Sequence, residues 1–408
     1  LVLDIVNQKA KQDQLVVVVS ALSKVTDLLQ SAAAKAAAND ESFREVVAEI
    51  EKKHLDTLKE LIPVSEQSSL LSHVKRIINH LETLLDGCFL LGELSPRTAD
   101  TILSFGELLS SYIIAQAFQQ TEKDAVYKDS REIIKTDSNF GKAAVNFEIS
   151  NKLIQDYFSE NQFQINILPG FIAQTLDGIT STLGRGGSDY TAAIIAGALD
   201  AEQLEIWTDV NGMFTANPKI VKQAQPIANI SYQEAMELSH FGAKVIYPPS
   251  LTPAFQKNIP IQILNTFEPS NSGTIIARDV PKQPYPITGI SSIDDIALVN
   301  IQGNGMIGVA GVSARLFTLL AANRISVILI SQASSEHSIC FAVDPKSAFG
   351  VKEILEHRPD LILDCIDDVK AKLALMLHCR FNKIPLIVSG GAGGKLDPLK
   401  IRVADLSK

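Results

Sequence analysis

Apolar residues along this chain follow two spacings. Residues 15–19 form a continuous apolar run with four valines, typical of a strand buried on both faces of a parallel sheet. From about residue 42 to residue 120 apolar positions recur every three or four residues, with breaks at Pro63 and Pro96, which predicts long helices. Strand-like and helix-like segments then alternate, at residues 125–127, 164–168, 188–199 (helix), 203–207 and 259–265. This alternation predicts an α/β sandwich.

The pattern changes after the proline-rich residues 281–286. A strand at 297–301, a glycine-bearing turn at 305–311, a helix at 312–323 and strands at 325–331 and 338–343 predict a small βαββ module that binds a ligand. The last fifty residues have another pattern. A strand at 361–364, a helix at 369–381, a strand at 385–389 and a glycine turn at 390–394 predict a short α/β tail.

Composition limits the class of protein. A chain of 408 residues predicts two or three domains, which we expect at residues 1–280, 281–355 and 356–408. The formal charge of −9 argues against nucleic acid as a partner. No apolar run approaches the roughly 20 residues that span a bilayer, so we expect no membrane contact. The four cysteines form no CxxC pair and the histidines are scattered, which favours free thiols, a cytoplasmic location and no metal site in the protein.

Candidate chemistry concentrates at residues 183–189, Leu-Gly-Arg-Gly-Gly-Ser-Asp. Glycines lack the Cβ that would keep a ligand away from the backbone, and their N–H groups can face an anion. Arg185 can hold a carboxylate with two parallel hydrogen bonds. The segment therefore predicts a loop that approaches a small charged molecule.

Two further segments, Trp-Thr-Asp-Val-Asn-Gly-Met-Phe at 207–214 and Phe-Gly-Ala-Lys-Val-Ile-Tyr-Pro at 241–248, follow in this order. Together the three segments resemble the aspartate kinase branch of the amino acid kinase family, most closely the kinase half of bifunctional aspartate kinase–homoserine dehydrogenases. The resemblance implies a three-layer αβα amino acid kinase sandwich with a helical insertion. It also implies phosphorylation of the side-chain carboxylate of L-aspartate, with ATP and Mg²⁺, on the route to lysine, threonine and methionine.

The resemblance assigns the aspartate site residue by residue. Arg185 would hold the substrate carboxylate and Asp189 its ammonium group, beside Gly187 and Ser188. The hydroxyl groups of Ser20 and Thr26 would line the same site, although capping of the following helix is an alternative role for both. Glu107 would face the substrate amine; without the resemblance, a lone Glu in a helical stretch is more typical of the surface.

The resemblance also assigns a nucleotide site. Residues 208–210 end an apolar strand, and ligands collect at the carboxyl ends of strands in α/β sheets. Asp209 and Lys244 are the expected catalytic residues, with Lys244 near the phosphates. Lys219 replaces an arginine of the family's common motif, so it keeps one charge and loses the two-pronged contact. The full set expected around ATP is Thr208, Asp209, Val210, Gly212, Phe214, Lys219 and Lys244.

The βαββ module resembles an ACT regulatory domain of the aspartate kinase type. The resemblance implies feedback control by threonine or lysine, and a homodimer in which the ACT-like modules pair side by side. The residues expected to bind the feedback amino acid are Met306, Ile307, Gly308, Gln332 and Ser335.

Both ends of the sequence depart from this family. Its members open with a strand carrying K-F-G-G-T-S, whereas Leu1 to Gln8 resembles the helix that follows, so we expect the sheet to lack one strand and activity to be weak or absent. Residues 364–368 and 389–398 resemble a piece of the ubiquitin-activating-enzyme-like tRNA threonylcarbamoyladenosine dehydratases, in which the position of Asp367 helps hold magnesium and ATP. We therefore expect a fusion, natural or artefactual, joined near residues 353–358.

Two alternatives to a kinase stay open from the sequence. One is a non-catalytic regulatory protein that binds an amino acid through residues 303–338. The other is a fragment of a ubiquitin-activating-like adenylating enzyme, suggested only by residues 364–408, which lack the glycine-rich nucleotide loop of that family.

Overall fold

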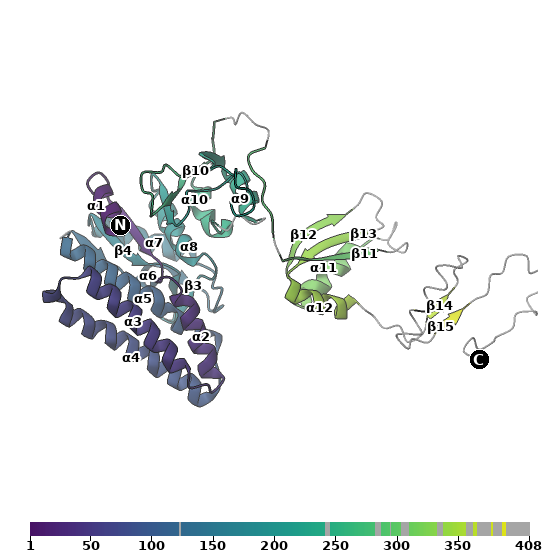
Figure 1. The fold of residues 1–408 in the computed structure, drawn as a ribbon, viewed down its shortest axis with the longest axis horizontal. Coiled ribbons are helices and arrows are strands. Elements are labelled where there is room, and N and C mark those ends of the chain that lie inside the picture. The colour runs from purple at the N-terminus through teal and green to yellow at the C-terminus, as the bar shows by residue number, and fades with distance from the viewer. Residues whose placement is uncertain are drawn as a thin grey trace, which may run out of the picture. The chain divides into compact units, whose positions relative to one another are not determined.

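The computed structural model of the protein describes residues 1–121, 124–240, 245–281, 287–293, 295–302, 310–332, 338–355, 362–364, 377 and 386–388. The chain forms two compact units, Leu1–Ile293 and Asp294–Lys408 (Figure 1). The first unit extends past residue 280, where a boundary was expected. Thr288 donates to Glu234 Oε1 at 2.5 Å, and the backbone N–H of Ile290 donates to the carbonyl of Thr215 at 2.8 Å.

A three-stranded parallel sheet joins segments that lie far apart in the sequence of the first unit. Strand β4 (Ile165–Pro169) lies between β1 (Leu15–Val19) and β2 (Ala125–Tyr127), and Leu15 pairs with Ile165. All five residues of β4 are buried, whereas all five of β1 are only half-buried. The prediction that β1 is buried on both faces is wrong, because in the described sheet it is an edge strand.

Two more sheets complete the strand layer of the first unit. One has the order β3–β5–β6, and in the other, β7–β9–β10–β8, strands β7 and β9 are parallel. Their bounds are β3 (Lys135–Thr136), β5 (Ile172–Thr175), β6 (Thr180–Thr182), β7 (Leu204–Thr208), β8 (Asn229–Ser231), β9 (Ile261–Asn265) and β10 (Thr274–Ala277).

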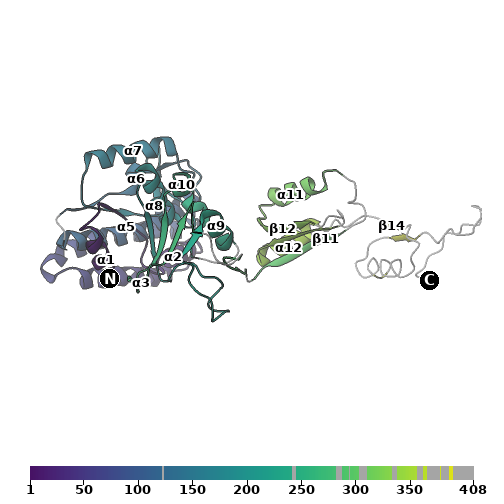
Figure 2. The same ribbon diagram turned by 90° about the horizontal axis from the view of Figure 1, so that it is seen from above.

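Helices lie on both sides of these strands, with α7 and α10 on one side and α2 and α3 on the other (Figure 2). The predicted three-layer α/β arrangement is confirmed. The shorter helices are α1 (Val2–Lys9), α6 (Ser130–Ile133), α7 (Phe147–Glu160), α8 (Gly187–Ala198), α9 (Tyr232–His240) and α10 (Thr252–Gln256), with 3-10 turns at Val64–Glu66 and Pro248–Leu251.

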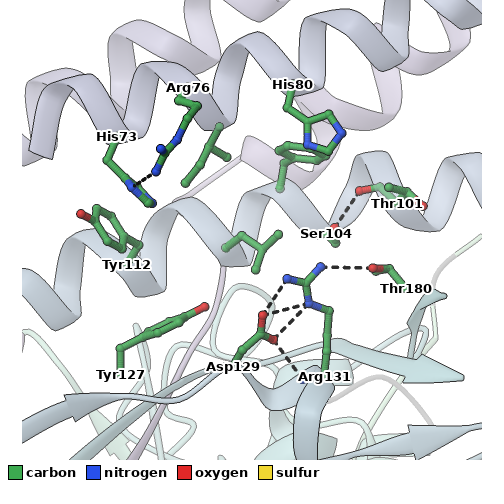
Figure 3. Close-up of a pocket in the computed structure, with 13 residues that line it drawn as sticks. His73, Arg76, His80, Thr101, Ser104, Tyr112, Tyr127, Asp129, Arg131 and Thr180 are labelled. Carbon is green, nitrogen blue, oxygen red and sulfur yellow. Dashed lines mark hydrogen bonds and ion pairs between the residues drawn. The ribbon is translucent and has the colours of Figure 1, made fainter. Parts of the chain in front are cut away.

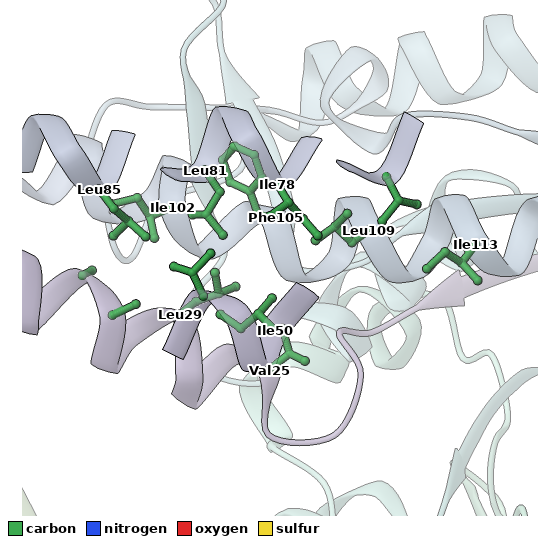
Figure 4. Close-up of a cluster of buried hydrophobic side chains, with 14 of the residues drawn as sticks. Val25, Leu29, Ile50, Ile78, Leu81, Leu85, Ile102, Phe105, Leu109 and Ile113 are labelled. Atoms are coloured by element: carbon green, nitrogen blue, oxygen red, sulfur yellow. The ribbon is translucent and has the colours of Figure 1, made fainter. Parts of the chain in front are cut away.

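The predicted helical stretch folds as three long helices, α3 (Phe43–Leu61), α4 (Gln67–Leu91) and α5 (Pro96–Thr121), and α2 (Val25–Ala37) precedes them. The breaks fall at Pro63 and Pro96, as predicted, and Gly92 ends α4 with a φ of 62°. Their facing apolar side chains form one core (Figure 4), with fully buried members that include Leu29, Ile50, Leu81 and Ile102. Helix α5 is apolar and long enough to span a bilayer, but 67% of that stretch is buried inside the unit, as in the core helix of a folded domain.

The second unit contains an antiparallel sheet of order β11–β13–β12 with two helices. Its bounds are β11 (Ala297–Gln302), α11 (Val312–Ala322), β12 (Val327–Gln332), β13 (Ser338–Val343) and α12 (Pro345–Leu355). The predicted βαββ order is confirmed, and α12 was not predicted. In the tail, β14 (Ile362–Asp364) pairs in parallel with β15 (Leu386–Val388). Asp367 and the predicted glycine turn at 390–394 lie outside the described residues.

Candidate active site

The carboxyl ends of β1 and β4 bring two loops together. Val19 pairs with Pro169 at the last position of the ladder, and the N–H of Gly170 donates to the carbonyl of Val19 at 2.9 Å. The chain leaves these strands as Ser20–Ala21 and Gly170–Phe171. Ligands of α/β sheets collect at such strand ends, so these two loops define one wall of a candidate site.

Glu107 of α5 lies under this wall with only 4% of its surface exposed. Its Oε1 accepts the backbone N–H of Ala21 at 3.2 Å, whereas its buried Oε2 has no partner. Burial raises the pKa of Glu107 to about 7. The surface alternative for this residue is wrong. A buried carboxylate oxygen without a donor marks a place where a cationic or N–H group of a ligand would be stabilised.

The segment between β6 and α8 forms the opposite wall. Gly184 and Gly186 have φ values of 73° and 68°, which side chains rarely adopt. A Cβ at Gly186 would lie 2.9 Å from the Cβ of Tyr247, so this glycine allows close packing on the protein itself. The Arg185 side chain is exposed, with its guanidinium carbon 5.7 Å from the centre of the Tyr247 ring.

The first turn of α8 carries Gly187, Ser188 and Asp189 against the Gly170–Phe171 loop. A Cβ at Gly170 would lie 2.7 Å from the Cβ of Ser188, and a Cβ at Gly187 would lie 2.6 Å from Phe171 Cδ2. Burial raises the pKa of Asp189 to about 6. An ammonium group nearby would restore the charged form of this carboxylate. The structure therefore brings the glycine loop and the strand-end loops into one site.

Phe171 belongs to this site and was missed from the sequence. Its φ of 65° is unusual for an aromatic residue, and its N–H donates to Thr191 Oγ1 at 3.0 Å. Such strained backbone is concentrated at functional sites. The available signal was Pro169-Gly170 directly after an apolar strand, which indicated a tight turn but not the residue that follows it.

Ser20 and Thr26 flank the start of α2. Ser20 is exposed at the strand end and its carbonyl accepts the hydroxyl of Ser110 at 2.8 Å, while Thr26 is half-buried in the first turn of α2. The N-terminal cap of α2 is Lys24, with no side-chain cap. The capping alternative for Ser20 and Thr26 is therefore wrong.

The candidate nucleotide segment follows β7, the next strand in the chain after α8. Helix α8 covers about 18 Å from Gly187 and β7 about 17 Å to Thr208, so a strand that returns along this helix ends near the level of the glycine loop. Thr208 donates to Asp209 Oδ1 at 3.2 Å, and Asn265, at the end of the neighbouring β9, donates to Asn211 Oδ1 at 2.6 Å. Asn265 was not expected here from the sequence.

The remaining nucleotide-site candidates follow this strand end. Gly212 has a φ of 99°, and a Cβ there would lie 2.3 Å from Thr274 Oγ1, so a glycine is required for packing. Val210 is half-buried, Phe214 pairs with Pro226 in an isolated bridge, and Lys219 is exposed. Lys244 lies outside the described residues. Among the residues that are described, no cluster of His, Cys, Asp and Glu could hold a metal ion.

A groove of about 620 Å³ lies elsewhere on the first unit, between α4, α5 and the segment after β2 (Figure 3). Arg131 pairs with Asp129 and donates to Thr180, and Arg76 lies 2.7 Å from His73 Nδ1. In the described part of the chain, none of the buried polar atoms that lack a partner lines this groove. It therefore has no counterpart to the unpaired oxygen of Glu107.

In the second unit only one of the expected feedback-site residues can be placed. Gln332 is exposed at the end of β12, and Met306, Ile307, Gly308 and Ser335 lie outside the described residues.

Strand-end loops and a glycine loop around a buried, unpaired carboxylate oxygen define a candidate ligand site in an α/β protein. Residues 1–265 match the family model for the amino acid kinase family, and residues 299–358 match a model for the ACT domain. The chain belongs to the amino acid kinase family.

Named relatives agree with this assignment. Bifunctional aspartokinase/homoserine dehydrogenase 1, chloroplastic, of Arabidopsis thaliana is 37% identical over 358 residues, which are 86% of this chain and 39% of that protein. Aspartokinase 3, chloroplastic, of the same plant is 32% identical over 89% of this chain and 64% of its own length. The chain thus spans about two fifths of the bifunctional relatives that it matches.

The fold is also similar to solved structures. Aspartokinase III of E. coli in complex with aspartate and ADP superposes with a TM-score of 0.71 at 29% identity, over 84% of this chain and 75% of that one. The same enzyme in complex with lysine and aspartate gives a TM-score of 0.67.

Proposed function

We propose that this chain is an aspartate kinase, which transfers the γ-phosphoryl group of ATP to the side-chain carboxylate of L-aspartate. The observation that carries the proposal is the buried, unpartnered Oε2 of Glu107 beside the Ser20–Ala21 loop. An amino acid substrate brings an ammonium group that satisfies this oxygen. The aspartokinase relatives, and the aspartate bound in the E. coli enzyme, support the choice of substrate.

Residues of the two walls then bind different groups of the substrate. Glu107 and Asp189 bind the ammonium group, and the exposed Arg185 holds the α-carboxylate with paired N–H donors. The side-chain carboxylate is left free to attack. Its oxygen forms a bond to the γ-phosphorus as the bond from that phosphorus to the ADP oxygen breaks, giving aspartyl phosphate and ADP. The protein's contribution is mainly to orient the two anions.

ATP binds at the ends of β7 and β9, where Thr208–Val210 and Asn211 meet Asn265. Mg²⁺ would neutralise phosphate charge, and an Mg²⁺ ion bound to a nucleotide needs few protein ligands. The exposed carboxylate of Asp209 is suited to be such a ligand. Lys244 would supply a positive charge near the phosphates. The expectation of weak or absent activity stays a prediction, as does the cytoplasmic location.

The second unit provides feedback control by an amino acid, threonine or lysine, and joins two chains as a homodimer. The lysine bound in the E. coli enzyme supports an amino acid as the effector. Two exposed apolar side chains on one face of its sheet, Leu298 on β11 and Leu329 on β12, support pairing of two such units, because exposed apolar strand surface favours association.

The test is formation of aspartyl hydroxamate from ATP, L-aspartate and hydroxylamine by the purified chain, beside a version extended at the N-terminus by a K-F-G-G-T-S strand. Activity that depends on both substrates supports the proposal, and Glu107→Gln should then raise the KM for aspartate more than the KM for ATP.

Silence of both versions, with threonine or lysine still bound in calorimetry, would instead favour a non-catalytic regulatory protein. Silence of both with no amino acid bound would overturn the proposal altogether. ATP–pyrophosphate exchange is the further readout for the adenylating alternative suggested by residues 364–408.

A further inference from the structure

Asp100, near the start of α5, is a buried carboxylate that the proposed reaction does not use. Its exposed fraction is 1%. Its Oδ2 accepts the backbone N–H of Thr182 and that of Gly141, each at 2.9 Å, and its Oδ1 accepts the hydroxyl of Thr182 at 2.8 Å. Three donors therefore satisfy one buried carboxyl group, and a buried polar group is tolerated only with such partners.

The partners of Asp100 lie at the base of the glycine loop. Thr182 ends β6, and the loop that carries Arg185 begins at the next residue. Gly141 is the other partner, and a Cβ at Gly184 would lie 3.4 Å from the carbonyl oxygen of Gly141. Asp100 thus fixes both the strand end from which the loop leaves and the segment against which the loop packs.

The same helix also holds the other wall of the site. Glu107 follows Asp100 by two helical turns, so both side chains lie on one side of α5. Glu107 accepts the N–H of Ala21, and Ser110 donates to the carbonyl of Ser20. Helix α5 is therefore hydrogen-bonded to the Ser20–Ala21 loop through one end of this face and, through the other, to the two segments at the base of the glycine loop.

Strand β6 itself offers little rigidity, because it has only three residues. Each of its side chains is held from a different element: Thr180 by Arg131, Ser181 by Thr136 and Thr182 by Asp100. Of these three anchors, Asp100 is the one that comes from the helix carrying Glu107, and the one at the end from which the loop leaves.

We propose that Asp100 is a positioning residue, which sets the distance between Glu107 and the Arg185 loop and so the fit of the amino acid substrate. The inference rests on the proposed function, since it names the residue that keeps the two walls of that site at a fixed distance. Asp100 touches neither substrate in this account. It acts through the backbone of Thr182 and Gly141.

The variants are Asp100→Ala, Asp100→Asn and Thr182→Val. Alanine removes the acceptor of the buried N–H of Thr182 and of the N–H of Gly141. Asparagine keeps an oxygen for those two groups, and the Thr182 hydroxyl can rotate to accept from the new amide. Valine at position 182 removes the hydroxyl and leaves both backbone bonds. Each variant is assayed for the KM of aspartate, the KM of ATP and the melting temperature, and hydrogen exchange is followed in peptides that cover residues 139–143 and 180–189.

We expect Asp100→Ala to raise the KM for aspartate by about tenfold or more and to leave the KM for ATP nearly unchanged. Asp100→Asn should recover most of the loss. Exchange should speed up in both peptides for the alanine variant only. If Asp100→Ala lowers the melting temperature while both KM values and the local exchange stay as in the wild type, Asp100 is only a structural residue and the inference is overturned.

Failure of the proposed function looks different. The wild-type chain would then form no hydroxamate, yet exchange at residues 180–189 would still separate the alanine variant from the asparagine variant if Asp100 positions the loop. Unchanged exchange in all variants overturns the positioning role whether or not the chain is a kinase.

Discussion

Glu107 Oε1 and the backbone N–H of Ala21 are 3.2 Å apart, which joins the middle of α5 to the loop that leaves β1. The second oxygen of the same carboxylate is buried and unpaired. Glu107 is thus an anchor for the loop and, in the function proposed above, a receptor for the ammonium group of the substrate.

The burial of Glu107 predicts a pH dependence of stability. The pKa of Glu107 is about 7 in the folded protein and 4.5 for a free carboxyl. Between these values the folded state holds a proton that the unfolded state has lost, so the free energy of unfolding falls as the pH rises, by on the order of 3 kcal/mol in total. The Glu107→Gln variant has no carboxyl group to titrate at this position. Its free energy of unfolding relative to that of the wild type should therefore rise from about pH 5 to about pH 8. Urea unfolding at both pH values measures the difference, and a difference that does not change with pH would contradict the prediction.

Replacement of Arg185 should weaken binding of aspartate. Lysine keeps the charge but cannot make two parallel bonds to a carboxylate, so Arg185→Lys and Arg185→Ala should both raise the dissociation constant, by roughly 10- to 100-fold for alanine. Calorimetry with L-aspartate measures it. Arg44→Ala is the matched control, because Arg44 is more than half exposed and pairs with Asp86 on the surface; it should leave binding unchanged.

Gly186 should tolerate no side chain. Alanine there meets the Cβ of Tyr247 at 2.9 Å in addition to the strain of a φ of 68°, and the two effects together should cost about 2–4 kcal/mol of unfolding free energy. Gly178 has a φ of 82°, but a Cβ there would have only the Gln174 side chain nearby, at 3.6 Å. Thermal unfolding should therefore show Gly178→Ala to be clearly milder. Equal losses would mean that backbone strain alone decides the cost.

The helical core should respond to truncation. Leu81 is fully buried, so Leu81→Ala should cost about 2–5 kcal/mol, as large-to-small changes in cores do. Leu90 lies on the same helix with 82% of its surface exposed, and Leu90→Ala should change stability by no more than about 0.5 kcal/mol. Denaturant unfolding of the two variants compares them directly, and a small loss at Leu81 would show that the packing around it can collapse.

A single charge on the second unit should weaken the proposed dimer. Leu329 is 43% exposed on β12 and shares a face of the sheet with Leu298, and Leu329→Lys would place an ammonium group in an apolar contact between two chains. Sedimentation should then show more monomer. The control is Ile290→Lys, at an exposed position of the first unit; the same shift with this variant would place the interface elsewhere.

Periodicity predicted the long elements well, because α3, α4 and α5 each present an apolar stripe. Helix α3 ends just before Pro63, α4 ends at Gly92 and α5 begins at Pro96. It could not predict β6. The residues of that strand are Thr, Ser and Thr, and they are held by hydrogen bonds to side chains far away in the sequence. A buried strand of hydroxyl side chains has the composition of a loop.

The candidate site was predicted in part, and mostly through resemblance. The glycines of residues 184–187 carry their own physical signal, and the structure gives positive φ values at two of them. Glu107 and Asp100 carry none, because a carboxylate on a helix is usually solvated. Their burial follows from partners such as Ala21 and Thr182, which become neighbours only when the sheet forms.

The pairing of β1 with β4 also constrains how the chain can be made. Leu15 can pair with Ile165 only after about 150 further residues have been synthesised. At the usual rate of synthesis this takes roughly 8 to 30 s. Meanwhile the helices between them can fold from local contacts. During this interval four consecutive valines remain without their strand partner, an apolar segment of the kind that aggregates. Slower synthesis should therefore increase the binding of chaperones to residues 15–19.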